Sequence, residues 1–272
     1  METQRSLVAI KPSMPASGGL HWQASVRSGI SLRALVGSWR YEGGKRDLRL
    51  DVIRGFAAFA MIADHIGGAP SWLYLITGGN EFAVSAAEPF VFLSGLTMGI
   101  VYAGVIRRSG IRAGVAKALR RAWTLYVLTV FLTFAFAALG GALNFWWAPD
   151  LSNGGILGFV VGVVTLHRTL FLTDIPLMYT FMLLAAVPAL VLLHRRHALL
   201  LLGLSWSLWG LWQLSPGAPN FPWHVQGNVV FFFPAWQVLF ITPLVIGYHR
   251  DTIERAMARV PRRVLMAGLE LG

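Results

Sequence analysis

Long apolar stretches dominate this sequence and constrain its fold more than any other feature. A helix needs roughly 20 mostly apolar residues to cross the hydrocarbon core of a bilayer, which is about 30 Å thick. Six stretches meet this requirement: residues 52–69, 84–106, 122–143, 175–193, 198–214 and 229–248. Only 13% of the residues are charged, whereas soluble domains have about 25%. The sequence therefore predicts an all-α, polytopic membrane helix bundle with about six transmembrane helices.

The basic residues predict the orientation of this bundle in the membrane. All but two of the 23 Lys and Arg residues, Arg54 and Arg168, fall on one side of the predicted spans. Cytoplasmic loops of membrane proteins carry an excess of Lys and Arg. We therefore expect both the N-terminus and the C-terminus on the cytoplasmic side, and an even number of spans.

Four segments complete the predicted organisation. Residues 1–45 are basic and rich in Ser, Gly and Pro, which predicts a disordered cytoplasmic tail; a targeting peptide and an over-extended start site are the alternatives. Residues 46–250 form the transmembrane domain, in which the short apolar stretch 154–166 predicts an interfacial or re-entrant helix. Residues 251–272 form a cytoplasmic tail, which we expect to be truncated because the chain ends as its sequence turns apolar again.

Composition and charge placement exclude several kinds of function. The formal net charge of +11 does not indicate nucleic-acid binding, because the basic residues separate apolar stretches instead of covering a folded surface. The chain has no cysteine, so disulfides, thiolate nucleophiles and cysteine metal sites are excluded. We predict no metal site and no bound cofactor, and we expect the lipid bilayer as a partner.

Ionisable residues inside the first predicted span are candidates for function, because charges cost several kcal/mol in a membrane unless they are paired or hydrated. Asp51 and Arg54 are three positions apart and can pair on one helix face. Arg54 and His65 are eleven positions apart, which places them on one face, about 16 Å apart along the axis. The alternatives are a snorkelling Arg54 and a His65 that only packs and forms a hydrogen bond. The neighbouring Asp64 favours the functional interpretation.

The second predicted span adds an acid, a serine and two glycines. Glu88 enters this span at the depth expected for Asp64 and His65. Gly95 and Gly99 form a small-residue face that we expect to pack against the first span. A serine such as Ser94 can be a nucleophile, but it more commonly donates to the carbonyl four residues earlier in a helix.

Polar residues in the later spans complete the candidate site. Asp174 and Tyr179 lie at the outer start of the fourth span. His167 and Arg168 precede them in the outer loop, where solvation alone explains their polar side chains. Trp236 and Gln237 lie in the sixth span, where they can bind a ligand hydroxyl or only another helix. We expect His65, Asp64, Glu88, Asp174 and Gln237 to approach one another in the outer half of the bundle, with Arg54 and Arg49 on the cytoplasmic side.

Several of these segments resemble the OpgC family of membrane acyltransferases. The resemblance lies in RDLRLDVIRG at residues 46–55, Asp64-His65 and EPFVFLSG at residues 88–95. The segments DIPLMY at residues 174–179 and FPAWQVLF at residues 233–240 are also similar to that family. The spacing of Arg54 and His65 also resembles the wider acyltransferase-3 superfamily.

This resemblance implies an activity and roles for the residues that carry it. It implies O-acyl transfer, in OpgC proper of a succinyl group, from cytoplasmic acyl-CoA as co-substrate to a periplasmic glucan or another carbohydrate. It also implies a multi-pass protein of the bacterial inner membrane. His65 would be the general base, and Arg54 would contact the phosphate or carboxylate of the donor. From their positions we further expect Asp64 or Glu88 to orient His65 or the substrate, Arg49 to contact the acyl donor, and Asp174, Tyr179, Trp236 and Gln237 to contact the acceptor.

Two other functions stay open at this point. Intramembrane Asp, Glu and His residues also form proton relays, so a proton-coupled transporter or flippase is one alternative. The sequence shows no internal repeat of the kind that many transporters contain. An inactive, truncated membrane subunit is the other alternative.

Overall fold

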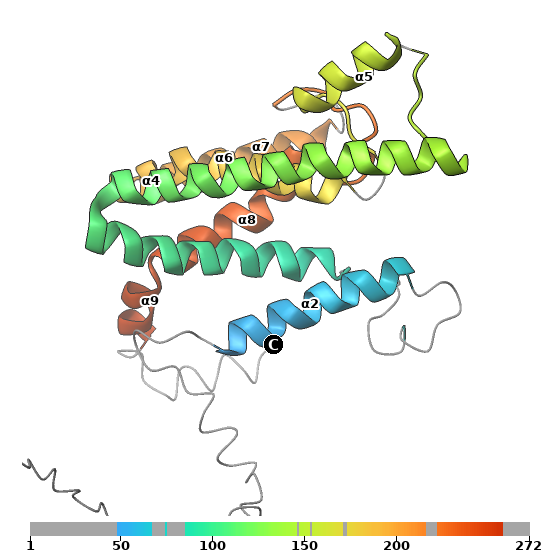
Figure 1. The fold of residues 1–272 in the computed structure, drawn as a ribbon. Helices are drawn as coiled ribbons and strands as arrows, with labels where there is room; N and C mark the ends of the chain where they lie inside the picture. Colours follow the sequence, from blue (N-terminus) through green and yellow to red (C-terminus); the bar gives the residue numbers. More distant parts are fainter. Residues whose placement is uncertain are drawn as a thin grey trace, which may run out of the picture. The chain divides into compact units, whose positions relative to one another are not determined.

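The fold consists of α-helices and the segments that connect them. The computed structural model describes residues 48–66, 74, 85–145, 147–152, 154–170, 173–215 and 222–257, with only the backbone at 65, 66 and 257. The helices are α2 (Leu48–Ile66), α4 (Ala87–Leu143), α5 (Gly155–Val164), α6 (Asp174–His194), α7 (Ala198–Leu214), α8 (Phe233–Tyr248) and α9 (Arg250–Met257) (Figure 1). Within these ranges there is no strand, only an isolated β-bridge. The all-α prediction is confirmed, whereas the predicted tail 1–45 lies outside the described residues.

Two predicted spans belong to one long helix that is broken at a glycine. Inside α4, Gly110 has φ 79° and ψ 168°, a backbone conformation that glycine adopts without the steric cost of a side chain. The chain doubles back there, so that α4 has a first arm (residues 87–109) and a second arm (residues 111–143) (Figure 1). The basic segment 107–121, expected to be a loop, is helical on both sides of this break. That expectation was wrong because Lys and Arg favour helices and extend them beyond the apolar stretch.

Two of the described helices are able to cross a membrane, judged by their length and apolar character. Within the described ranges, α4 and α6 are long and apolar enough to cross a membrane, while α5, α7 and α8 are shorter apolar helices. The predicted stretch 198–214 coincides with α7, and α5 forms where a short helix was expected. The number of six spans stays a prediction, as do the inner membrane and the orientation of the termini.

The first arm of α4 packs tightly against α8. A Cβ atom on Gly95 would contact the carbonyl oxygen of Phe240, and one on Gly99 would contact that of Leu244. On α8, Gly247 plays the same part, because a Cβ atom there would contact the carbonyl oxygen of Leu96 in the first arm. The expectation that this glycine face packs against the first span was therefore wrong. Small residues allow two backbones to approach closely, but they do not specify which helix approaches.

Buried threonines join the second arm of α4 to α6. The hydroxyls of Thr129 and Thr180 are 3.3 Å apart, and the Thr133 hydroxyl donates to that of Thr173 at 3.2 Å. All four side chains are at most 2% exposed. As the residue numbers rise along α4, they fall along α6, so the two helices run antiparallel.

Arg168 is buried in the connections at one end of the bundle, whereas solvation was the expectation. It is 7% exposed and its Nη2 donates to the carbonyl oxygen of Asp150 at 2.8 Å. Its guanidinium also lies 5.4 Å from the centre of the Phe159 ring. The backbone N–H of Thr169 donates to the carbonyl oxygen of Gln226, whose own N–H donates to that of His167, and these bonds tie this connection to the segment before α8. The exposed His167 stacks on the indole of Trp223 instead of being merely solvated.

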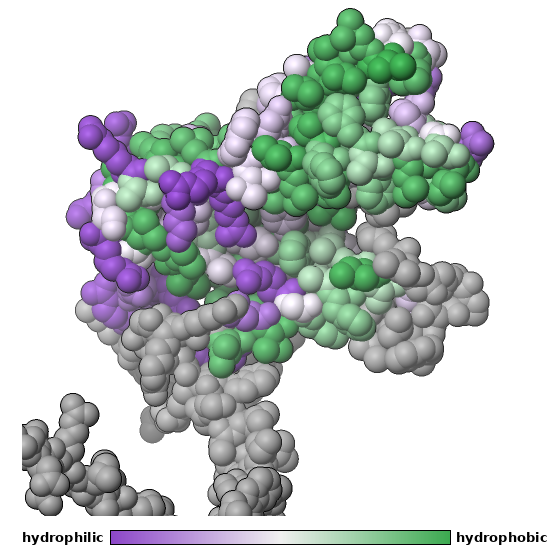
Figure 2. All heavy atoms as spheres, viewed as in Figure 1, coloured by the Kyte–Doolittle hydropathy of each residue, from purple (hydrophilic) through white to green (hydrophobic). Residues whose placement is uncertain are grey.

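The outward surface of several helices is strongly apolar. On α2, Phe56, Phe59 and Ile62 are about half exposed, while the small residues Ala57 and Ala60 are buried. Hydrophobic side chains also cover much of the visible face over α4 and α5 (Figure 2). Large exposed apolar patches mark protein or membrane contacts, and here they are consistent with lipid-facing helices.

Candidate functional site

The helix α2 carries the first residues of the predicted site. Arg54 Nη2 lies 3.2 Å from Asp51 Oδ1, so the predicted pairing at a spacing of three is confirmed. Both side chains are partly exposed, and such ion pairs contribute at most about 1 kcal/mol to stability. The pair therefore explains how the Arg54 side chain is oriented. It does not explain why an arginine is present at this position of α2. Arg49 lies on the first turn of the same helix and is exposed.

The predicted base His65 lies on the last turn of α2. The helix is continuous from Arg54 to this turn, so the eleven-residue spacing falls within one helix. The side chain of His65 lies outside the described part of the chain. Asp64 is half-buried, and its carbonyl oxygen accepts a hydrogen bond from the Tyr74 hydroxyl at 3.4 Å. The expected convergence of Asp64, His65, Glu88, Asp174 and Gln237 stays a prediction.

The structure brings Ser94 and Tyr179 together from two helices. The Tyr179 hydroxyl on α6 donates to Ser94 Oγ on the first arm of α4 at 3.4 Å. Ser94 Oγ in turn donates to the carbonyl oxygen of Phe90 at 2.8 Å, which confirms the predicted bond to the carbonyl four residues earlier. The rings of Phe90 and Tyr179 meet edge to face, with centroids 5.7 Å apart. The phenol is thereby held in one position between α4 and α6.

Two arginines lie within electrostatic range of this hydroxyl. They are Arg54 of α2 and Arg121 of the second arm of α4. The Ser94–Tyr179 pair is therefore exposed to positive charge from two further helical segments. Such an arrangement favours a negatively charged group, or a carbonyl oxygen on which negative charge develops. We call these four residues the Tyr179 cluster.

Arg121 is the member of the Tyr179 cluster that sequence reasoning did not single out. It is one of six basic residues in the segment 107–121, which the sequence predicts to be a cytoplasmic loop. Its position immediately before the predicted span 122–143 was the available signal. Because the second arm is already helical there, Arg121 lies on the bundle and not on a flexible connection.

The predicted acids lie at the starts of helices. Glu88 is in the first turn of α4, half-buried, and its carboxylate accepts a hydrogen bond from the Ser85 hydroxyl. Asp174 is in the first turn of α6 and is 6% exposed. The positive end of a helix dipole stabilises negative charge at both positions. Stabilisation by the helix dipole is therefore a structural reason for the presence of each acid. It stands beside the predicted role of each acid in the site.

Trp236 and Gln237 form bonds within the helix bundle. Gln237 is 3% exposed; its Nε2 donates to the carbonyl oxygen of Ser205 at 2.7 Å, and its Oε1 accepts from Ser205 Oγ at 2.5 Å. Trp236 Nε1 donates to the carbonyl oxygen of Val230 at 3.1 Å. Of the two alternatives, the structure favours bonding of Gln237 to another helix, here α7. A role of either residue in acceptor binding stays a prediction.

Comparison with known proteins gives one match. Residues 46–271 match a protein family described as OpgC protein. This range covers all helices described from α2 to α9 and every residue of the Tyr179 cluster. No curated protein and no solved structure matches the chain.

Proposed function

The chain belongs to the OpgC family, and on this basis we propose that it is a membrane-bound O-acyltransferase that modifies a glucan. The donor is cytoplasmic acyl-CoA, with succinyl-CoA as the specific proposal, and the acceptor is a hydroxyl of a periplasmic glucan or another carbohydrate. The protein lies in the bacterial inner membrane with both termini in the cytoplasm. The apolar helices α4 and α6 and the family support the membrane location.

One observation supports this proposal most directly, namely the positive charge around the Tyr179 hydroxyl. Arg54 and Arg121 both act on a hydroxyl that is already bonded to Ser94. Arg54 is held by Asp51 and Arg121 is exposed, so both positive charges are in place to attract an anion. A succinyl group supplies a free carboxylate, and its thioester carbonyl develops negative charge during transfer. The Tyr179 cluster is therefore our proposed site for the acyl end of the donor, with Arg49 as a further contact.

The proposed reaction needs a base for the acceptor hydroxyl. His65 takes the proton of the acceptor hydroxyl while that oxygen bonds to the thioester carbonyl carbon. The carbon–sulfur bond then breaks, CoA leaves as a thiol with the proton from His65, and the ester remains on the carbohydrate. Asp64 or Glu88 orients His65 or the substrate. Tyr179, which lies in the proposed donor site, is also a proposed contact of the acceptor, together with Asp174, Trp236 and Gln237.

The test uses membrane vesicles, labelled succinyl-CoA and a glucan acceptor. His65→Ala should abolish transfer of label to the glucan without changing expression. Arg121→Gln should raise KM for the donor, whereas the control Arg120→Gln, which removes a charge from the adjacent position, should not. Retained turnover in His65→Ala would remove His65 from the mechanism. Movement of a solute in proteoliposomes without any acylated product would favour the transporter instead.

A further inference from the structure

A groove of about 480 Å³ lies between the second arm of α4 and α6, and no residue of the Tyr179 cluster lines it. One wall is formed by Leu119, Trp123 and Tyr126 of the second arm of α4, and the other by Leu184 of α6. Leu166 and Trp223, from the connections outside these two helices, also line the groove. Pockets of 300–1,000 Å³ are typical of small-molecule sites. The groove is thus large enough to hold a ligand and is not merely a packing defect.

The polar atoms that line this groove are already used within the protein. The Tyr126 hydroxyl donates to the carbonyl oxygen of Val164 at 2.8 Å, and Trp223 Nε1 donates to that of Leu166 at 3.0 Å. The Thr180 hydroxyl donates to a carbonyl oxygen within α6. A polar ligand buried here would lose its hydrogen bonds to water and gain few in return. The groove therefore suits a hydrocarbon chain.

Each of the two helices that form the walls of the groove is followed toward the same end by an arginine. Arg112 lies seven positions before Leu119 on the second arm, two helical turns away on the same face. Arg195 directly follows the last residue of α6, the helix that carries Leu184. The antiparallel pairing of Thr129 with Thr180 places these two arginines at the same level. Both are exposed. The apolar groove thus has two cations at one end.

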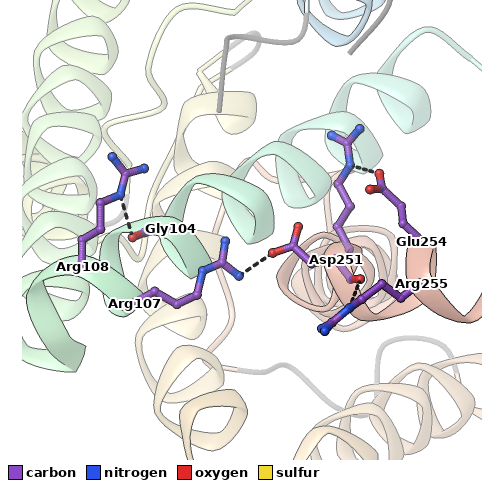
Figure 3. Close-up of polar contacts among 7 residues, drawn as sticks. Gly104, Arg107, Arg108, Asp251, Glu254 and Arg255 are labelled. Atoms are coloured by element: carbon purple, nitrogen blue, oxygen red, sulfur yellow. Dashed lines mark hydrogen bonds and ion pairs between the residues drawn. The ribbon is translucent and has the colours of Figure 1, made fainter. Parts of the chain in front are cut away.

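Three of the other arginines at this end already have partners inside the protein. Arg107 pairs with Asp251 at 2.9 Å, Arg250 pairs with Glu254 at 2.6 Å, and Arg108 donates to the carbonyl oxygen of Gly104 at 3.3 Å (Figure 3). Within the described part of the chain, neither Arg112 nor Arg195 forms an ion pair or a side-chain hydrogen bond. These two guanidinium groups are therefore free to bind an anion from outside.

We propose that the groove binds an anionic phospholipid, with one acyl chain between α4 and α6 and the phosphate head group on Arg112 and Arg195. The combination of a chain-sized apolar groove and two free cations at one end fits this amphiphile. Hydrophilic side chains gather at the end where the two arms of α4 join, beside a hydrophobic surface (Figure 2). The site is separate from the proposed reaction and holds whether or not the chain transfers acyl groups.

Native mass spectrometry of the full chain in detergent tests this site with phosphatidylglycerol and phosphatidylcholine as probes. Each basic residue near anionic lipid contributes about 1 kcal/mol, or roughly fivefold in affinity. Replacing both arginines, Arg112→Gln with Arg195→Gln, should weaken phosphatidylglycerol binding about 25-fold. The matched control, Arg108→Gln with Arg196→Gln, removes the same charge from the same end and should leave binding within a factor of a few.

A second pair of variants tests the chain-binding part of the groove. Leu119→Trp fills the groove and should weaken binding of both lipids, whereas Leu139→Trp, at an exposed position on the same arm outside the groove, should not. Equal affinity for the two lipids, or unchanged binding in the double arginine variant or in Leu119→Trp, would overturn the proposal. A dimer that disappears in Leu119→Trp would show that a second copy of the chain occupies the groove, and would also overturn it.

Discussion

The carbonyl oxygen of Leu244 on α8 lies where a side chain on Gly99 would have to begin. Gly95 faces the carbonyl oxygen of Phe240 in the same way, one helical turn away. These two helices are therefore in backbone contact along one face. The contact fixes the first arm of α4, which carries Ser94 next to Gly95, against the remainder of the bundle.

Gly99→Ala should destabilise the protein because its new methyl group would overlap the α8 backbone. Overpacking of this kind costs typically 1–3 kcal/mol. Thermal unfolding in detergent, followed by tryptophan fluorescence, should show a clearly lower Tm. The control is Gly141→Ala, because a Cβ atom there meets nothing within 4 Å. Equal melting temperatures for the two variants would contradict the tight contact.

Sequence patterns predicted which segments are helical better than they predicted how the helices pair. The apolar stretch 198–214 became α7 without any shift, because its boundaries coincide with polar or helix-breaking residues. The pair Gly95 and Gly99 correctly indicated a close helix contact, but it was assigned to the wrong partner. A glycine face shows that a backbone can approach, whereas the approaching helix is decided by the whole fold.

Ser94→Ala and Tyr179→Phe should show coupled effects on stability. Each variant removes one side of the 3.4 Å hydrogen bond between α4 and α6, so the double variant should lose less than the sum of the two. A hydrogen bond of this kind is worth about 0.5–1.5 kcal/mol, which sets the expected coupling. Chemical unfolding of the four proteins in detergent gives this coupling. Additive effects would mean that the bond contributes nothing.

The site was predictable where its residues share a helix. The spacing of three between Asp51 and Arg54, and the four-residue step from Phe90 to Ser94, determine contacts within one helix turn. The association of Arg121 with Tyr179 depends on how the second arm packs, because these residues are far apart in the sequence. Periodicity contains no information on that packing.

Gln237→Ala should lower stability because it leaves the polar atoms of Ser205 without their buried partner. The expected loss is about 1–3 kcal/mol, the cost of unsatisfied buried groups. The measurement combines Tm with KM for the glucan acceptor. A rise in KM without a change in Tm would instead show that Gln237 binds the acceptor. Trp236→Phe is the neighbouring control. The indole of Trp236 donates to the carbonyl oxygen of Val230, just before α8, and not to another helix.

Acidification should weaken the connection between α4 and α5 through Asp150. Hydrogen bonds from the backbone and side chain of Ser152 lower the pKa of the Asp150 carboxyl below its ordinary value of 3.8, and the charge of Arg168 adds to this effect. A carboxyl whose pKa is lower in the folded state contributes stability above its unfolded pKa, and this contribution is lost as the pH falls through the folded value. Tm should therefore be higher for the wild type than for Asp150→Asn at neutral pH. This difference should shrink below about pH 4. Ser152→Ala should make the loss smaller and complete at a higher pH, because removing the side-chain bond moves the folded-state pKa of Asp150 toward its ordinary value. A difference in Tm that stays constant down to pH 3 would show that the Asp150 charge plays no part in holding this connection.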